Sequence, residues 1–194
     1  MRNNIVRLSS LTLKNIKNVK NGTIVMPLTN ERKTEYGKAE ILGVYGQNGS
    51  GKTAIVDALY FLQAIMIGKK LDQRISDYIS TDSLNAEINV EFNIFEGDVL
   101  YEVGYHVILT KLEDRVVIER EYLNCAINKE GYRTNKNIFM DYQRTQMDSV
   151  FKPLKRLEEL VGRDKEIKMD LIVARKMAEK SNCSYIFGSD SREI

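Results

Sequence analysis

The sequence contains few of the residues that build metal, disulfide and redox sites. Its 194 residues include only two cysteines and one histidine. Cys125 and Cys183 form no CxxC pair and have no companion histidines, so we expect buried thiols in a reducing cytoplasm rather than a disulfide or a metal site. His106 stands alone in an alternating apolar stretch. A catalytic or metal-binding role for it is therefore not predicted.

Long apolar runs and a strong charge of one sign are also lacking. No apolar run approaches the ~20 residues that cross a bilayer, and Met1–Asn4 lead into the chain without the apolar core of a secretory signal. We therefore expect a cytoplasmic protein with no membrane partner. The formal net charge of +2 is too small to predict or exclude nucleic-acid binding.

The first part of the chain alternates in the manner of β-strands. Strand-like patterns cover residues 5–16 and 23–26, with Asn21-Gly22 as the expected turn before the second. Residues 28–38 are polar and predict a surface loop. The short apolar run at 39–45 then predicts a strand that is covered on both faces, as in a parallel sheet.

The next segment carries the chemistry. The loop matches GxxxxGK[ST] completely, and its residues are Gly46, Gln47, Asn48, Gly49, Ser50, Gly51, Lys52 and Thr53. Glycines allow the main chain to approach phosphate closely, and successive amide N–H groups can point into one concavity at a helix N-terminus. Lys52 is expected to contact the β- and γ-phosphates, and the Thr53 hydroxyl to bind Mg²⁺. The sequence therefore predicts ATP with Mg²⁺ as ligands.

A helix is predicted immediately after this loop. Between Lys52 and Ile67 the apolar period changes to 3.6, and Gly68 is a suitable end. Residues 70–85 are mixed and polar, which predicts a loop with a short helix. The apolar stripe of the long helix is formed by Ile55, Ala58, Leu59, Leu62, Ile65 and Met66.

Three strands and then helices are predicted in the second part. Alternating residues at 86–94, 101–109 and 116–123, joined by short turns, predict an antiparallel meander that forms a layer separate from the parallel sheet. After about residue 140 the pattern becomes helical, and residues 184–188 predict a last strand or edge. Two helical stripes are expected, one at Leu154, Leu157 and Val161 and one at Ile167, Leu171, Ala174 and Ala178.

Three stretches together resemble one branch of phosphate-loop proteins. The loop has the GxNGxGK[ST] form of ABC-class ATPase heads, and Ala54–Leu62 resembles the xxxDAIxFxL continuation of SMC, RecF and OLD-like ATPases. Leu11–Asn18 resembles the first strand of the same group. The resemblance covers residues 5 to about 125 and is closest to bacterial AAA-family ATPases of the OLD and abortive-infection kind. It implies that Lys17 lies near the nucleotide.

The resemblance also implies elements that the chain does not match securely. A family glutamine that contacts Mg²⁺ or the attacking water has only Gln143 and Gln146 as candidates, although an exposed helical position is the expectation for both. No apolar strand ends in Asp-Glu, and the nearest approach is Tyr185–Asp190. Glu119 and Glu121 are expected to share one solvated strand face. No LSGGQ-like sequence is present.

These observations predict an α/β fold, namely a P-loop NTPase half-head. It comprises a parallel core strand, the phosphate-loop helix, an antiparallel β-meander and a helical C-terminal segment. Residues 1–140 form the ATP-binding lobe in this interpretation, and residues 141–194 lead into a C-terminal lobe. ATP hydrolysis is expected only when that lobe completes the site. The resemblance implies a setting in DNA maintenance or phage defence, a homodimer joined through ATP, and DNA as a further partner.

Two other functions remain open at this point. A small self-contained P-loop kinase or nucleotide switch would need a phosphate-clamping arginine, for which Arg156, Arg163 and Arg175 are the candidates, although helical solvated faces are expected for them. A non-hydrolysing interaction module stabilised by its ligand is the third hypothesis. Lys14, Lys17 and Lys20 line up near the N-terminus, where spaced lysines usually belong to an ordinary surface.

Overall fold

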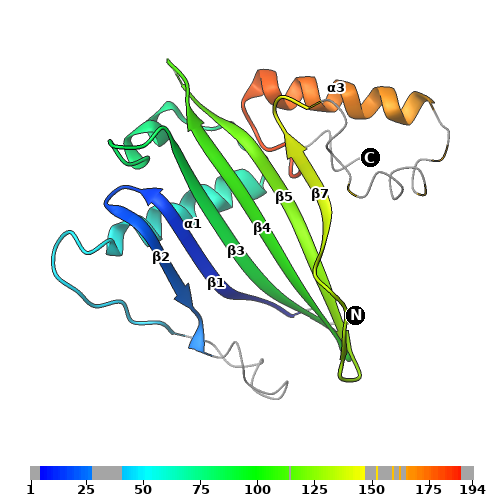
Figure 1. Ribbon diagram of the computed structural model, residues 1–194, viewed down its shortest axis with the longest axis horizontal. Helices are drawn as coiled ribbons and strands as arrows, with labels where there is room; N and C mark the ends of the chain where they lie inside the picture. Colours follow the sequence, from blue (N-terminus) through cyan, green and yellow to red (C-terminus); the bar gives the residue numbers. More distant parts are fainter. Residues whose placement is uncertain are drawn as a thin grey trace.

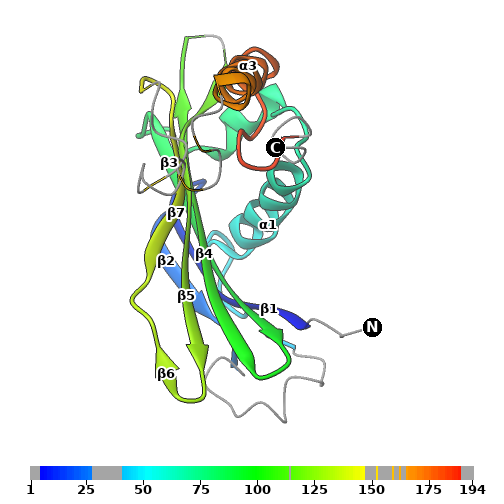
Figure 2. The ribbon, with the colours of Figure 1, turned by 90° about the vertical axis from the view of Figure 1, so that its right-hand side faces the viewer.

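The computed structural model describes residues 5–27, 41–113, 115–146, 152, 159, 162 and 165–188. Within these residues the chain forms one seven-stranded sheet, and Figures 1 and 2 show helix α1 lying across one of its faces. The strands are β1 (Ile5–Ile16), β2 (Val19–Val25), β3 (Asn85–Glu96), β4 (Val99–Lys111), β5 (Val116–Lys129), β6 (Tyr132–Arg133) and β7 (Asn137–Gln143). The helices are α1 (Lys52–Met66), the 3₁₀-helix η3 (Gln73–Tyr78) and α3 (Lys165–Ser181).

The strand order is β2-β1-β3-β4-β5-β6, with β7 also paired to β5, and every pairing is antiparallel. The three predicted meander strands are confirmed as β3, β4 and β5. Their register aligns Ile88 with Val107 and Val90 with Tyr105, and all four side chains are fully buried. Alternation of these residues with polar ones therefore correctly identifies the face that is covered by helix α1.

The N-terminal strands belong to the same sheet as the meander, and the described residues show no second, parallel layer. Strand β1 pairs with β3 from Ile5 to Lys14. The expected turn at Asn21-Gly22 is also wrong, because these residues lie inside β2 opposite Lys14 and Leu13. The chain instead reverses at Lys17-Asn18, where Lys17 has a φ of 50°. Short-range turn signals were outweighed by the long pairing between β1 and β3.

The predicted core strand before the phosphate loop is not formed. Residues 41–47 have no regular structure, and Ile41 and Tyr45 are 89% and 94% exposed. Residues 39 and 40, like the predicted loop at 28–38, lie outside the described residues. No strand among the described residues is parallel to another. The parallel core therefore has no counterpart in the part of the chain that the structure describes.

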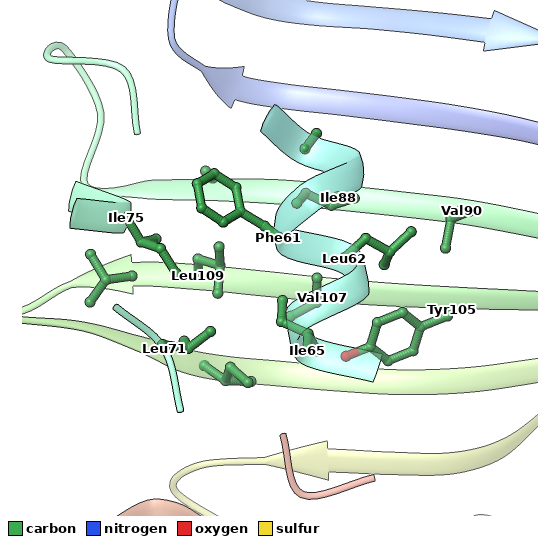
Figure 3. Close-up of a cluster of buried hydrophobic side chains, with 14 of the residues drawn as sticks. Phe61, Leu62, Ile65, Leu71, Ile75, Ile88, Val90, Tyr105, Val107 and Leu109 are labelled. Carbon is green, nitrogen blue, oxygen red and sulfur yellow. The ribbon is translucent and has the colours of Figure 1, made fainter. Parts of the chain in front are cut away.

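Helix α1 forms as predicted, with its buried face slightly rotated from the expected stripe. Phe61, Leu62 and Ile65 pack over Ile88 and Val107, as Figure 3 shows. Phe61 was not part of the predicted stripe, whereas Leu59 is exposed. Burial of each large side chain contributes about 1.5–3 kcal/mol, so this interface is the main attachment of α1 to the sheet.

The C-terminal part combines one confirmed helix with two differences. Helix α3 buries three of its four predicted stripe positions, and it is followed by Asn182 with a φ of 53°. Residues 184–188 do not form the predicted strand but bend along the α1 side of the sheet, where Tyr185 and Ile186 join the core. Strand β7 was not expected and crosses residue 140, where helix was predicted. The stripe at 154, 157 and 161 lies outside the described residues.

Candidate functional site

The phosphate loop lies at the N-terminus of α1. Gly51 is the N-cap, with a left-handed φ of 91°, and no side chain caps the helix. The first turn of a helix presents N–H groups that have no partner inside the helix, together with the positive end of the helix dipole. The start of α1 therefore has the backbone character of an anion-binding site.

Two glycines of the loop have a positive φ, but the space around them differs. Gly49 has a φ of 86°, and a Cβ there would meet nothing within 4 Å. Gly51 also has positive φ, but its Cβ would stand 2.5 Å from Cγ2 of Val19. The loop is thus packed tightly against the start of β2 at Gly51 and is open at Gly49.

Gly51→Ala is expected to destabilise the fold more than Gly49→Ala. The left-handed conformation costs an L-residue about 1–2 kcal/mol at either position, and Gly51→Ala adds the clash with Val19. Urea denaturation measures both variants, and Val19→Ala in the Gly51→Ala background should recover part of the difference. Equal losses of stability in the two glycine variants would contradict the close packing of the loop on β2.

Lys52 holds its ammonium group at the mouth of this loop. Its Nζ donates to the carbonyl oxygens of Gly46 and Gln47, at 2.5 and 2.7 Å. The N–H of Ser50 donates to the same Gln47 oxygen at 3.2 Å. Thr53 follows on the exposed first turn. The loop therefore gathers one ammonium group, the hydroxyl groups of Ser50 and Thr53, and the helix N-terminus in a short segment.

A cavity of about 520 Å³ opens beside the loop, between it and the β1–β2 hairpin. Gly49, Ser50 and Gly51 form one side of the cavity. Apolar side chains and polar groups of the hairpin form the rest, among them Leu11, Leu13, Val19, Ile24, Asn18, Lys20, Asn21 and Thr23. Cavities of roughly 300–1,000 Å³ that combine apolar walls with a few polar groups are typical of small-molecule sites. Sequence reasoning did not find this lining, because it depends on how the hairpin packs against the loop.

Lys17 lies in the hairpin turn, and its ammonium group is paired with a carboxylate. Its Nζ forms a salt bridge with Asp57 of α1 and lies 4.5 Å from the centre of the Tyr78 ring. Its backbone N–H donates to the Tyr78 carbonyl at 2.6 Å. Asp57 is one helical turn beyond Thr53, so Lys17 is close to the first turns of α1 but directed at the helix.

The other two lysines of the N-terminal row have different surroundings. Lys14 pairs with Glu87 at 2.7 Å, and Lys20 lines the cavity beside the loop. With Lys17 bound to Asp57, two of the three charges are therefore neutralised. The row does not present a continuous basic surface.

The glutamine candidates lie at the other edge of the sheet. Gln143 ends β7, which pairs with β5, whereas the loop packs against the β1–β2 hairpin. Gln146 follows in the turn after β7. Neither occupies the expected helix, and the structure brings neither to the phosphate loop. Their positions are set by the pairing of β7, which the sequence pattern did not reveal.

A solvated helix face was expected for Arg175, but its side chain is buried. Its guanidinium group donates to the carbonyl oxygens of Gln143, Arg144 and Gln146 and pairs with Glu179. These contacts hold the turn after β7 against α3. Arg156 and Arg163, the other candidates for a phosphate clamp, lie outside the described residues.

Glu121 was expected on a solvated strand face, but its side chain is fully buried. The register shift after Ile108 leaves Glu119 as an extra residue, so Ile118 and Glu121 pair with Leu109 and Val107 on the inner face. Such a β-bulge breaks strict alternation. Glu119 remains exposed as predicted and accepts a hydrogen bond from the Thr110 hydroxyl.

The Glu121 carboxylate binds residues 184–186 to the sheet through hydrogen bonds. Its Oε2 accepts hydrogen bonds from the Tyr105 and Ser184 hydroxyl groups at 2.7 and 2.8 Å. Its Oε1 accepts from the backbone N–H groups of Tyr185 and Ile186 at 2.5 and 3.0 Å. Burial raises the pKa of Glu121, and these four donors oppose the shift. Residues 184–186 therefore surround a buried carboxylate. Asp190, the last residue of the Tyr185–Asp190 stretch, lies outside the described residues.

The histidine and the cysteines offer no metal site. His106 contacts Glu87 at 3.4 Å, and burial lowers its pKa. Cys125 and Cys183 are free thiols, both half-buried. Among the described residues no group of three or more potential ligands could hold a metal ion. No helix in this part of the chain is long and apolar enough to cross a membrane.

Comparison with known families identifies the class of protein. The family model described as an AAA domain matches residues 10–184. The match includes the phosphate loop, α1, the whole meander and the Glu121-bound segment as far as Ser184. The chain therefore belongs to the AAA domain family, and this membership indicates a nucleotide-binding, ATPase-type function. No curated protein matches the chain.

Proposed function

We propose that this chain is the ATP- and Mg²⁺-binding N-terminal portion of an SMC/RecF/OLD-like ATPase. The observation that carries the proposal is the Gly46–Thr53 loop at the uncapped start of α1, with the Lys52 ammonium group held at its mouth. The adjacent cavity between the loop and the β1–β2 hairpin has room for a nucleoside. Thr53 supplies the hydroxyl for Mg²⁺. The bound cation would neutralise phosphate charge.

The exposed apolar segment before the loop supports a partner lobe. Ile41 and Tyr45 are 89% and 94% exposed, and neither belongs to a strand of the described sheet. Val56 and Tyr60 on the neighbouring helix are also largely exposed. Exposed large apolar side chains can mark an interaction site, and an apolar segment without strand partners can pair with an added strand. We infer that a C-terminal lobe covers this surface and supplies the carboxylates for hydrolysis.

The kinase alternative receives no support from Arg175, the one described residue among its candidate arginines. The Arg175 guanidinium group already donates hydrogen bonds to three backbone carbonyl groups and forms a salt bridge with Glu179. A phosphate clamp would need a guanidinium group free to reach the loop. The proposal of DNA maintenance or phage defence as the setting, and of a homodimer joined through ATP, rests on the sequence resemblance.

The half-head proposal predicts binding without turnover. Calorimetry should detect Mg-ATP binding by the chain alone, and ATP hydrolysis should rise strongly when the polypeptide encoded downstream is added. Hydrogen exchange at residues 41–45 should slow in the same mixture, while exchange in β4 serves as an unaffected control. Efficient phosphoryl transfer to a small acceptor by the chain alone would contradict the proposal and favour a kinase.

A further inference from the structure

Three cationic side chains from distant parts of the sequence line one cavity. Lys70 follows α1, Arg115 lies between β4 and β5, and Lys180 lies in the last turn of α3. The cavity has a volume of about 490 Å³, and Gln73 and Asn182 also line it. The tertiary fold brings these cations together, since more than forty residues separate Lys70 from Arg115 and more than sixty separate Arg115 from Lys180 in the sequence.

These cations differ from several cations of the sheet, which pair with carboxylates. Within the part of the chain that the structure describes, Lys70, Arg115 and Lys180 have no carboxylate partner, whereas Lys14 and Arg133 pair with glutamates. The one carboxylate that lines this cavity, Asp72, is engaged elsewhere. It accepts hydrogen bonds from the Arg74 N–H at 2.9 Å and from the Arg74 side chain at 2.7 and 3.0 Å. The cavity therefore presents an excess of positive charge.

The adjoining cavity does not share this excess of positive charge. An adjoining cavity of about 590 Å³ shares Gln73 and Arg115 but also contains the carboxylates of Asp77 and Glu113. Lys111 on its wall donates to the backbone carbonyl groups of Ile79 and Ser80. Like charges brought together without partners are unfavourable, and a bound anion removes this cost.

We propose that Lys70, Arg115 and Lys180 form a second anion site that binds the phosphate groups of a ligand. The site lies beyond the C-terminal end of α1, roughly 22 Å along the helix from the phosphate loop for its 15 residues at ~1.5 Å each. Arg115 contributes a planar guanidinium group that suits two phosphate oxygens, and the lysines contribute mobile point charges. The phosphate belongs either to a free polyphosphate or to a nucleic-acid backbone, which share this chemistry.

The test uses the full chain with Lys52→Ala, so that the phosphate loop does not contribute. Pyrophosphate binding is followed by calorimetry, and binding of a fluorescein-labelled single-stranded oligonucleotide by anisotropy. Arg115→Gln with Lys180→Gln should weaken binding of the probe about tenfold or more. For the oligonucleotide, the slope of log K against log salt should fall in magnitude by roughly 1.4, since about 0.7 is expected for each of the two lost phosphate contacts. Lys165→Gln with Lys168→Gln removes equal charge from the exposed start of α3 as a control.

The two probes separate the sources of phosphate. Site-dependent binding of pyrophosphate assigns a small polyphosphate ligand, and site-dependent binding of the oligonucleotide alone assigns a nucleic-acid backbone. Failure of both probes to bind the Lys52→Ala protein would overturn the proposal. Equal weakening by the two charge-matched double variants would also overturn it, because binding would then follow net charge. None of these results bears on ATP binding at the phosphate loop.

Discussion

Lys52→Ala is expected to weaken Mg-ATP binding by about 100-fold or more. Hydrogen bonds to charged groups contribute roughly 1.5–3 kcal/mol each, and the loss of two such contacts to phosphate is worth at least about 3 kcal/mol. Among the described residues, the Lys52 ammonium group contacts Gly46, Gln47 and Ser50, all within the loop itself. The free energy of unfolding should therefore change by less than about 1 kcal/mol. Isothermal calorimetry and urea denaturation measure the two quantities.

Two further variants make this result specific. Lys168→Ala removes an exposed cation from α3 and should leave ATP affinity unchanged. Lys52→Arg keeps the charge but changes the geometry of the donors, so it should restore only part of the affinity. If Lys52→Ala bound Mg-ATP as tightly as the unaltered chain, the assignment of the phosphate loop would be wrong.

The second large effect is expected at Glu121. Glu121→Ala removes the acceptor of four hydrogen bonds and leaves their donors buried between the sheet and residues 184–186. A buried donor left without an acceptor costs about 1–3 kcal/mol, so partial relaxation of four donors leaves an expected loss of about 3–5 kcal/mol. The melting temperature should fall by roughly 10 °C, because 1 kcal/mol corresponds to about 2–4 °C in a chain of this size. Thermal and urea denaturation measure the change.

Glu119→Ala is the matched control on the same strand. Glu119 is exposed and accepts a hydrogen bond from Thr110, so its replacement should cost less than about 1 kcal/mol. Comparable losses for the two variants would show that the buried contacts of Glu121 contribute little. Hydrogen exchange should also show residues 184–186 released in Glu121→Ala before the meander opens.

The same carboxylate makes stability depend on pH. Burial raises the pKa of Glu121 above its ordinary value of 4.5, so the folded state holds the proton to higher pH than the unfolded state. The contribution of Glu121 is thus most favourable below pH 4.5 and declines as the pH rises through the folded pKa. Glu121→Gln has no such titration. As the pH rises from 4.5 through the pKa of Glu121 in the folded state, the unaltered chain should therefore lose stability relative to Glu121→Gln. Urea denaturation at several pH values measures this difference, and a difference that does not change with pH would contradict the raised pKa.

Local patterns predicted the elements whose determinants are local. The alternation of β3, β4 and β5 and the helical period of α1 depend on neighbouring residues, and these strands and this helix formed at the expected places. The family match over residues 10–184 agrees with the broad class that the loop indicates. Patterns failed where partners are distant. The pairing of β1 with β3 and of β7 with β5 has no local signal.

The sequence alone determined the strand and helix periods and the spacing of the phosphate loop, because these follow from side-chain order along a few turns or residues. Only the tertiary structure decided that the N-terminal hairpin joins the meander in one sheet, that a bulge turns Glu121 inward, and that Ile41–Tyr45 stay uncovered. It also brought Lys70, Arg115 and Lys180 together. These outcomes depend on register and packing between segments far apart in the chain, where a shift of one residue reverses which side chains are buried.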